Sequence, residues 1–218
     1  MRQLILDLLP ENPPRLDNFV PGGNGEAVAA LAAWARPDSS ETSLLLYGES
    51  GSGKTHLLRA ASDDYRDAAA TPDLADIEAP GNARCIAVDN VEALSGDGQI
   101  ALFKLFNRLR ADGGRLLTAA RQPPRRLALR EDLRTRLGSG LVYRLVPLAD
   151  EEKRDALAAQ AAARALSLPP GALDYLFSHV ERDMRHLAAV LGALDRYSLE
   201  SKRPITLPLL REVLRHPL

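Results

Sequence analysis

The chain has 218 residues, enough for one sizeable domain or for one domain with a small appendage. Hydrophobic residues make up 45% and charged residues 26%, an ordinary composition for a globular protein. The formal net charge of −1 gives no field that would draw the whole molecule onto nucleic acid or an anionic membrane. No apolar run reaches the length of a membrane span and the first residues make a poor signal peptide, so we expect a cytoplasmic protein.

Cysteine and histidine usage excludes two kinds of site. Cys85 is the single cysteine, so no disulfide can form within the chain, and its apolar surroundings are typical of a buried strand. The four histidines lack the spacing that metal ligands show.

The predicted elements alternate between strands and helices over the first two thirds of the chain. Residues 1–25 are rich in proline and predict a tether followed by an ordered turn. The expected strands are 44–47, 84–88, 115–119 and 141–146, and the expected helices are 26–34, 54–66 and 97–111. This alternation is typical of a parallel α/β sheet. The acidic segment 62–82 shows almost no strand pattern and is expected to be a loop, which leaves the sheet one strand short.

From Asp150 onward only helical patterns remain, which predicts a separate small all-α domain after residue 149. Asp150 is expected to cap a helix that starts at Glu151, because acids fill its first turn. The further helices are expected at about 171–180, 184–194 and from 208 onward.

The most specific motif lies at residues 48–55 and fits the phosphate-binding pattern G-x-x-x-x-G-K-[ST]. In such a P-loop the glycines let backbone N–H groups surround phosphate oxygens, Lys54 reaches the outer phosphates and the Thr55 hydroxyl binds Mg²⁺. An apolar run precedes the loop and a helical pattern follows it, as the motif requires. The residues expected at the nucleotide are Gly48, Ser50, Gly51, Ser52, Gly53, Lys54, Thr55 and His56.

A second part of the predicted nucleotide site follows the apolar run 86–88. In P-loop proteins such a strand places its terminal acid, here Asp89, to hold Mg²⁺ directly or through water. Many hydrolytic ATPases carry another acid at the position of Asn90, but an amide cannot take a proton from water. Intrinsic ATP hydrolysis is therefore expected to be weak.

Several stretches occur in the order found in DnaA-type initiators of the AAA+ class, and the chain resembles that family over roughly residues 15–218. They are 16–22, 44–58, 131–138 and 182–187. The resemblance implies an α/β P-loop AAA+ core, with a parallel sheet flanked by helices, plus a small C-terminal all-α lid. It implies adenine nucleotide (ADP or ATP) and Mg²⁺ as cofactors.

The resemblance also implies roles for individual residues. Phe19 and Val20 would lie against the adenine, and Arg185 would face the nucleotide from the lid. Arg136 stands at the arginine-finger position, where it would act in trans on a partner's nucleotide. Arg121 departs from the polar or acidic residue usual at the end of its strand, so it either contacts phosphate or weakens the network that triggers hydrolysis.

Two local features of the chain leave alternatives open. Residues 3–8, which include Leu4, are similar to the Q-L-x-L-x-[LF] peptide that docks bacterial proteins on the replication sliding clamp. Such an extended peptide would place Leu6 and Leu8 in an apolar pocket, with a hydrogen bond from Gln3 at its edge. The alternative is a first strand or a staple on the core. The arginines between 121 and 130 either contact DNA phosphates or form a solvated mixed-charge loop beside Glu131 and Asp132.

Together these resemblances imply a regulatory AAA+ adaptor that docks on the DNA polymerase III sliding clamp and stimulates hydrolysis of DnaA-bound ATP, and so restrains replication initiation. Its partners would be the clamp, DnaA and, through the clamp, DNA; a homo-oligomer is compatible with this reading, and no membrane partner is expected. The expected parts are a clamp-binding tether (1–14), a nucleotide-binding core (15–149) and a lid (150–218). The alternative function is a self-sufficient P-loop ATPase that loads helicase or remodels DNA.

Overall fold

The computed structural model describes residues 13–75, 77, 84–180, 182–201 and 204–215. It divides into two compact units, one spanning Pro14–Pro147 and the other containing the chain from Leu148 onward. Among the described residues, no helix is both long enough and apolar enough to cross a bilayer.

The first unit is built on a five-stranded parallel sheet with the strand order β2-β3-β4-β1-β5. The strands are β1 (Ser43–Tyr47), β2 (Asp64–Asp67), β3 (Cys85–Asp89), β4 (Arg115–Ala120) and β5 (Leu141–Arg144). Because β4 lies between β1 and β3, the carboxyl end of β4 separates the loop after β1 from the acid that ends β3. Ligands of open α/β sheets bind at this carboxyl edge.

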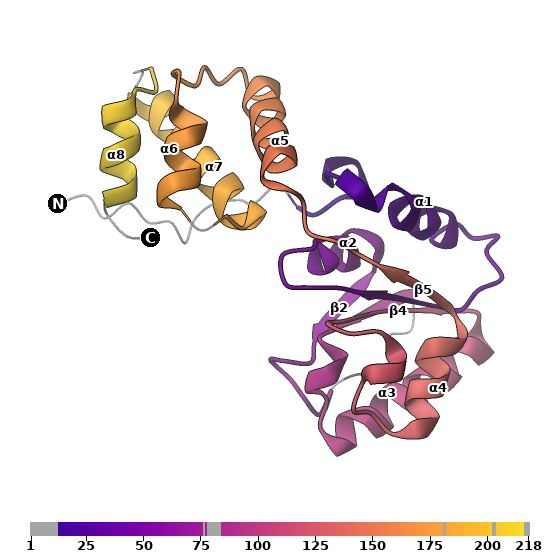
Figure 1. Ribbon diagram of the computed structural model, residues 1–218. Helices are drawn as coiled ribbons and strands as arrows, with labels where there is room; N and C mark the ends of the chain where they lie inside the picture. Colours follow the sequence, from indigo (N-terminus) through magenta and orange to yellow (C-terminus); the bar gives the residue numbers. More distant parts are fainter. Residues whose placement is uncertain (1–12, 76, 78–83, 181, 202–203, 216–218) are drawn as a thin grey trace. The chain divides into compact units, whose positions relative to one another are not determined.

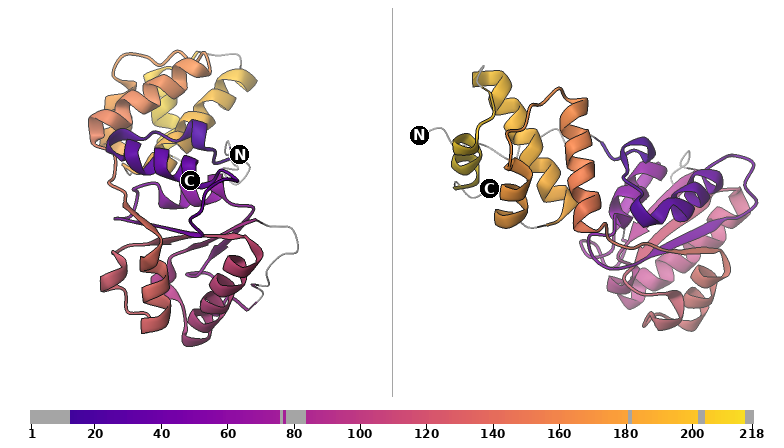
Figure 2. Two further views of the ribbon diagram at one scale, coloured as in Figure 1. Left: turned by 90° about the vertical axis from the view of Figure 1, so that its right-hand side faces the viewer. Right: turned by 45° about the horizontal axis from the view of Figure 1, so that its top comes forward.

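Helices cover both faces of the sheet (Figure 1 and Figure 2). Leu44 and Leu46 of β1 pack in the cluster that contains the helices of one face, whereas Leu45 packs in the cluster of the other face. This alternation is the period of two that a strand imposes. The first face carries α1 (Gly25–Trp34) and α2 (Lys54–Ala61), and the second carries α3 (Gly96–Asp112) and α4 (Glu131–Ser139). Short 3₁₀ helices span Leu16–Asn18, Gly22–Asn24, Val91–Ala93 and Pro124–Arg126.

Strand β2 corrects the sequence prediction, which extended a helix over 54–66 and left 62–82 as a loop. Helix α2 ends at Ala61 because Ser62 adopts an extended backbone and donates its hydroxyl to the Leu58 carbonyl at 2.8 Å. The strand that follows reads Asp-Tyr-Arg-Asp and pairs only with β3, at the edge of the sheet. Edge strands tolerate charged residues, so β2 leaves no apolar run in the sequence. The expectation of a sheet one strand short was wrong.

The second unit is all-helical, as predicted, with α5 (Asp150–Ala163), α6 (Ala172–His179), α7 (Met184–Ser201) and α8 (Leu207–Arg215). Its apolar core gathers residues from all four helices. The side chains in it with no exposed surface are Leu157, Leu176, Leu187, Leu191, Leu194 and Leu210. The all-α lid therefore has a hydrophobic core of its own.

The start of α5 differs in detail from the prediction. The N-cap residue is Ala149 rather than Asp150, and Glu152 accepts a hydrogen bond from the Ala149 N–H at 2.7 Å. Asp150 is instead the first helical residue, and its carboxylate accepts hydrogen bonds from Lys153 and Arg182 at 3.3 and 2.6 Å. These two donors, Lys153 first, hold the pKa of Asp150 below its usual value.

Candidate nucleotide-binding site

The loop between β1 and α2 depends on glycine at both of its ends. A Cβ on Gly48 would collide with the carbonyl oxygen of Leu145. Gly53 has a left-handed φ of +90°, and a Cβ there would lie 2.5 Å from a ring carbon of Phe19. Helix α2 begins directly afterwards, so its first N–H groups, which lack intrahelical partners, border the loop.

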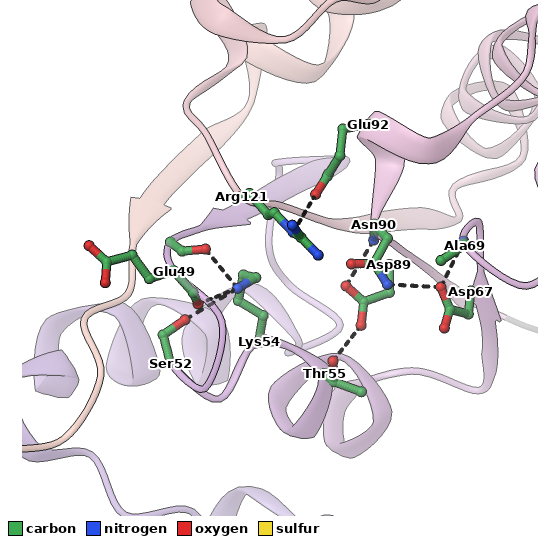
Figure 3. Close-up of polar contacts among 11 residues, drawn as sticks. Glu49, Ser52, Lys54, Thr55, Asp67, Ala69, Asp89, Asn90, Glu92 and Arg121 are labelled. Carbon is green, nitrogen blue, oxygen red and sulfur yellow. Dashed lines mark hydrogen bonds and ion pairs between the residues drawn. The ribbon is translucent and has the colours of Figure 1, made fainter. Parts of the chain in front are cut away.

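Lys54 is buried at the centre of this loop, with 8% of its surface exposed. Its ammonium donates hydrogen bonds to the carbonyls of Gly48 and Glu49, each at 2.7 Å, and to the Ser52 hydroxyl at 3.4 Å (Figure 3). Burial lowers the pKa of Lys54, and the nearby Asp89 carboxylate opposes that shift. Ser52 is buried with Lys54, whereas Ser50 and Gly51 are exposed at the tip of the loop.

Asp89 ends β3 and faces the start of α2, with 1% of its surface exposed. Its Oδ2 accepts hydrogen bonds from the Thr55 hydroxyl at 2.6 Å and from the Tyr65 hydroxyl at 3.1 Å. Its Oδ1 accepts one from the N–H of Asn90 at 2.9 Å. Three donors therefore hold this buried carboxylate in one orientation, as buried charges require.

The side-chain oxygens of Thr55 and Asp89 are metal ligands of the kind that Mg²⁺ prefers. Mg²⁺ usually binds through one or two protein carboxylates together with the phosphates of a substrate. The residues present thus fit a magnesium–phosphate group.

Two further carboxylates lie near Asp89, and each is engaged by a neighbour (Figure 3). Asp67, at the end of β2, accepts a hydrogen bond from the Asn90 side-chain amide at 2.8 Å. Glu92 pairs with Arg121 at 3.6 Å. Asn90 itself adopts a left-handed φ of +53°, and the chain turns into a 3₁₀ helix directly after it. The strand therefore ends at Asp89, and the Asn90 amide is directed to β2.

The segment before the sheet contacts the P-loop through aromatic rings. The ring centroids of Phe19 and His56 lie 5.4 Å apart, and His56 is within hydrogen-bond distance of the Arg15 carbonyl at 3.0 Å. Phe19 also lies against Gly53, and Val20 follows it as a half-buried residue. The structure thus brings Phe19 and His56 together at the start of α2.

Arg136 lies on α4, on the sheet face opposite α2. Its guanidinium sits 5.8 Å from the ring centroid of Phe106, and among the described residues it forms no ion pair. Among the neighbouring arginines, Arg130 forms an ion pair with Asp132 at 3.0 Å. Arg125 and Arg126 are exposed on a 3₁₀ helix, whereas Arg136 is half-buried.

Some predicted residues or their side chains lie outside the described part of the chain, and the sequence prediction missed two residues that contact Asp89 or Asn90. Gln3, Leu4, Leu6 and Leu8 lie outside the described residues. Arg185 belongs to α7, and its side chain lies outside the described part. Tyr65 and Asp67 were not predicted, because their place beside Asp89 and Asn90 follows from the pairing of β2 with β3.

Comparison with known proteins places two family models on the chain. The model of the bacterial DnaA ATPase domain matches residues 12–79, and the model of the Hda lid domain matches residues 150–214. Together, the two matches support an Hda-like AAA+ protein of the DnaA family. This confirms the resemblance seen in the sequence, which already included the lid.

Solved structures share the fold of this Hda-like chain. Domain III of the Thermotoga maritima initiator DnaA is 24% identical with a TM-score of 0.73, over 95% of this chain and 98% of that one. AMPPCP-bound DnaA from Aquifex aeolicus is 22% identical with a TM-score of 0.65, over 88% and 70%. The Thermotoga maritima Holliday junction branch migration motor RuvB is 16% identical with a TM-score of 0.66, over 93% and 72%.

Proposed function

We propose that this chain is a regulatory AAA+ adaptor that binds an adenine nucleotide with Mg²⁺, docks on the replication sliding clamp and stimulates hydrolysis of DnaA-bound ATP. The observation that carries the proposal is the Hda lid domain behind a DnaA-type ATPase domain. In this reading the protein restrains the initiation of chromosome replication by converting DnaA-ATP to DnaA-ADP.

The nucleotide part of the proposal is supported by the P-loop and by a relative. The buried Lys54 and the Thr55–Asp89 pair supply the groups that phosphate and Mg²⁺ need. A DnaA of the same fold is known with AMPPCP bound. Phe19, beside Gly53, is the proposed contact for adenine, and Arg185 the proposed contact from the lid.

Weak intrinsic turnover is supported by the contacts of Asn90. Its amide donates to Asp67 and cannot act as a base, and Glu92 is paired with Arg121. Arg136, on α4 with its guanidinium 5.8 Å from the Phe106 ring centroid, is the proposed finger for another molecule's nucleotide. Arginine fingers supplied in trans raise phosphoryl-transfer rates by ~10³–10⁵-fold.

The test is hydrolysis of DnaA-bound ATP in the presence of DNA-loaded clamp. Arg136→Ala should lose on the order of 10³-fold of the stimulation. Arg108→Ala, an exposed arginine on α3, is the control and should stay active. The double variant Leu6→Ala/Leu8→Ala should lose the part of the stimulation that depends on DNA-loaded clamp. Full activity of the Arg136 variant would exclude it as the finger.

The same preparation distinguishes the alternative of a self-sufficient ATPase. The branch migration motor RuvB shares this fold, and a motor that remodels DNA is therefore the alternative to be tested. Turnover of several ATP per second by the chain without DnaA would favour it over the adaptor.

A further inference from the structure

Tyr65 lies on β2, outside every motif that the nucleotide site was assembled from. Strands β2 and β3 pair in parallel, with Tyr65 opposite Ala87 and Asp67 opposite Asp89. Residues two apart on a strand share a face, so Ala87 and Asp89 both face α2. Tyr65 shares that face, since its ring packs with the same cluster as Ala87.

The Tyr65 hydroxyl reaches the oxygen of Asp89 that Thr55 also contacts. It donates to Oδ2 at 3.1 Å, and Thr55 donates to the same atom at 2.6 Å. Thr55 belongs to the P-loop motif, in which the hydroxyl at this position binds Mg²⁺. Tyr65 comes from the next strand outward, so it can hold Asp89 without occupying the nucleotide side of the site.

Two contacts keep Tyr65 in this position. The Arg59 guanidinium of α2 lies 4.5 Å from the centroid of its ring. Tyr65 is also half-buried, and its ring packs against the apolar cluster that includes residues of α2. The hydroxyl is therefore presented to Asp89 by packing, and little conformational freedom is lost when the hydrogen bond forms.

We propose that Tyr65 is a positioning residue for the Mg²⁺–nucleotide group, which fixes the orientation of the Asp89 carboxylate through the Tyr65 Oη–Asp89 Oδ2 hydrogen bond. Outer partners of this kind orient metal-binding carboxylates, and their loss weakens metal binding. The inference rests on the proposed nucleotide site, and it assigns Tyr65 no contact with the nucleotide.

The test is Tyr65→Phe in the full chain, because phenylalanine keeps the ring and removes only the donor. Binding of fluorescent ADP is titrated with Mg²⁺ and, separately, in EDTA. The apparent affinity for Mg²⁺ in the presence of ADP should fall about tenfold. The affinity for ADP in EDTA should stay within twofold of wild type. Tyr143→Phe, on β5, is the matched control and should change neither value.

The outcomes separate this inference from the proposed function. If the wild-type protein binds ADP with no Mg²⁺ dependence, the proposed magnesium site itself is wrong. If the wild type shows Mg²⁺-dependent binding and Tyr65→Phe matches it, only the role of Tyr65 is wrong. Equal losses of ADP affinity in Mg²⁺ and in EDTA, with a lower unfolding midpoint, would make Tyr65 a packing residue and would also overturn the inference.

Discussion

At the scale of single residues, Gly53 shows how the P-loop is joined to the segment before it. Its positive φ favours glycine, and the ring of Phe19 fills the space where a side chain would stand. The spacing of Gly53 in the motif could be predicted from sequence because the motif is contiguous. The contact with Phe19 could not, since the 33 residues between Phe19 and Gly53 must first fold.

Gly53→Ala is expected to destabilise the protein more than Gly113→Ala. Both positions have positive φ, but a Cβ on Gly113 meets nothing within 4 Å. Backbone strain alone should cost Gly113→Ala about 1 kcal/mol. The collision with Phe19 should add roughly 1–3 kcal/mol at Gly53. Urea unfolding measures both, and the added cost should disappear in a Phe19→Ala background. Equal costs for the two glycines would contradict the role of the Phe19 contact.

Cys85 is expected to be unreactive in the native protein at pH 8. Burial, with a smaller contribution from Asp63, raises the pKa of its thiol to about 12. The native thiolate fraction at pH 8 is then roughly 10⁻⁴, against about a tenth in the unfolded chain. A raised thiol pKa favours folding below the unfolded value of about 9, and this stabilisation is lost as the pH rises toward 12.

Alkylation read by mass spectrometry tests this directly, because Cys85 is the single cysteine. Iodoacetamide should label the urea-unfolded protein within minutes and the native protein far more slowly. Equal labelling rates would contradict the burial of the thiol.

At the scale of elements, β2 shows what the sequence could and could not predict. Strands β1, β3 and β4 are covered on both faces, so their sequences are apolar runs that were recognised. Strand β2 is a polar edge strand, and the sequence prediction assigned it partly to the end of a helix and partly to a loop. Its pairing with β3 then supplies Tyr65 and Asp67 to the site, so one missed element removed two residues from the prediction.

Asn24 joins two elements that are far apart in the chain. Its side chain donates to the Val146 carbonyl at 2.9 Å and accepts from the Val146 N–H at 2.8 Å. Asn24 is buried, and this pair fixes the 3₁₀ helix before α1 to the segment after β5. No local pattern predicts this link, because its two residues are 122 positions apart.

Asn24→Ala is expected to lower the free energy of unfolding by about 1–3 kcal/mol, because it leaves both backbone groups of Val146 without this partner. Asn107→Ala on the exposed side of α3 should change it by no more than about 0.5 kcal/mol. Urea titration of both variants provides the comparison. A cost for Asn24→Ala no larger than that of the control would show that the Asn24–Val146 pair adds no stability.

At the scale of the whole molecule, the chain combines an AAA+ core with a lid that has its own hydrophobic core. This division and the fold class were predicted from the change in element pattern near residue 149 and from the order of the motifs. The proposed function depends on partners, and residues such as Arg136 and Leu6 acquire their roles only in contact with them.

The most direct measurement asks which protein's ATP is hydrolysed. DnaA is loaded with radiolabelled ATP and the chain with unlabelled ADP, and the two are mixed with DNA-loaded clamp in a single-turnover experiment. We expect the labelled ATP on DnaA to lose its γ-phosphate rapidly with the wild-type chain and not above background with Arg136→Ala. Labelled ATP that survives the wild-type chain unchanged, while the chain alone hydrolyses ATP at several per second, would contradict this expectation.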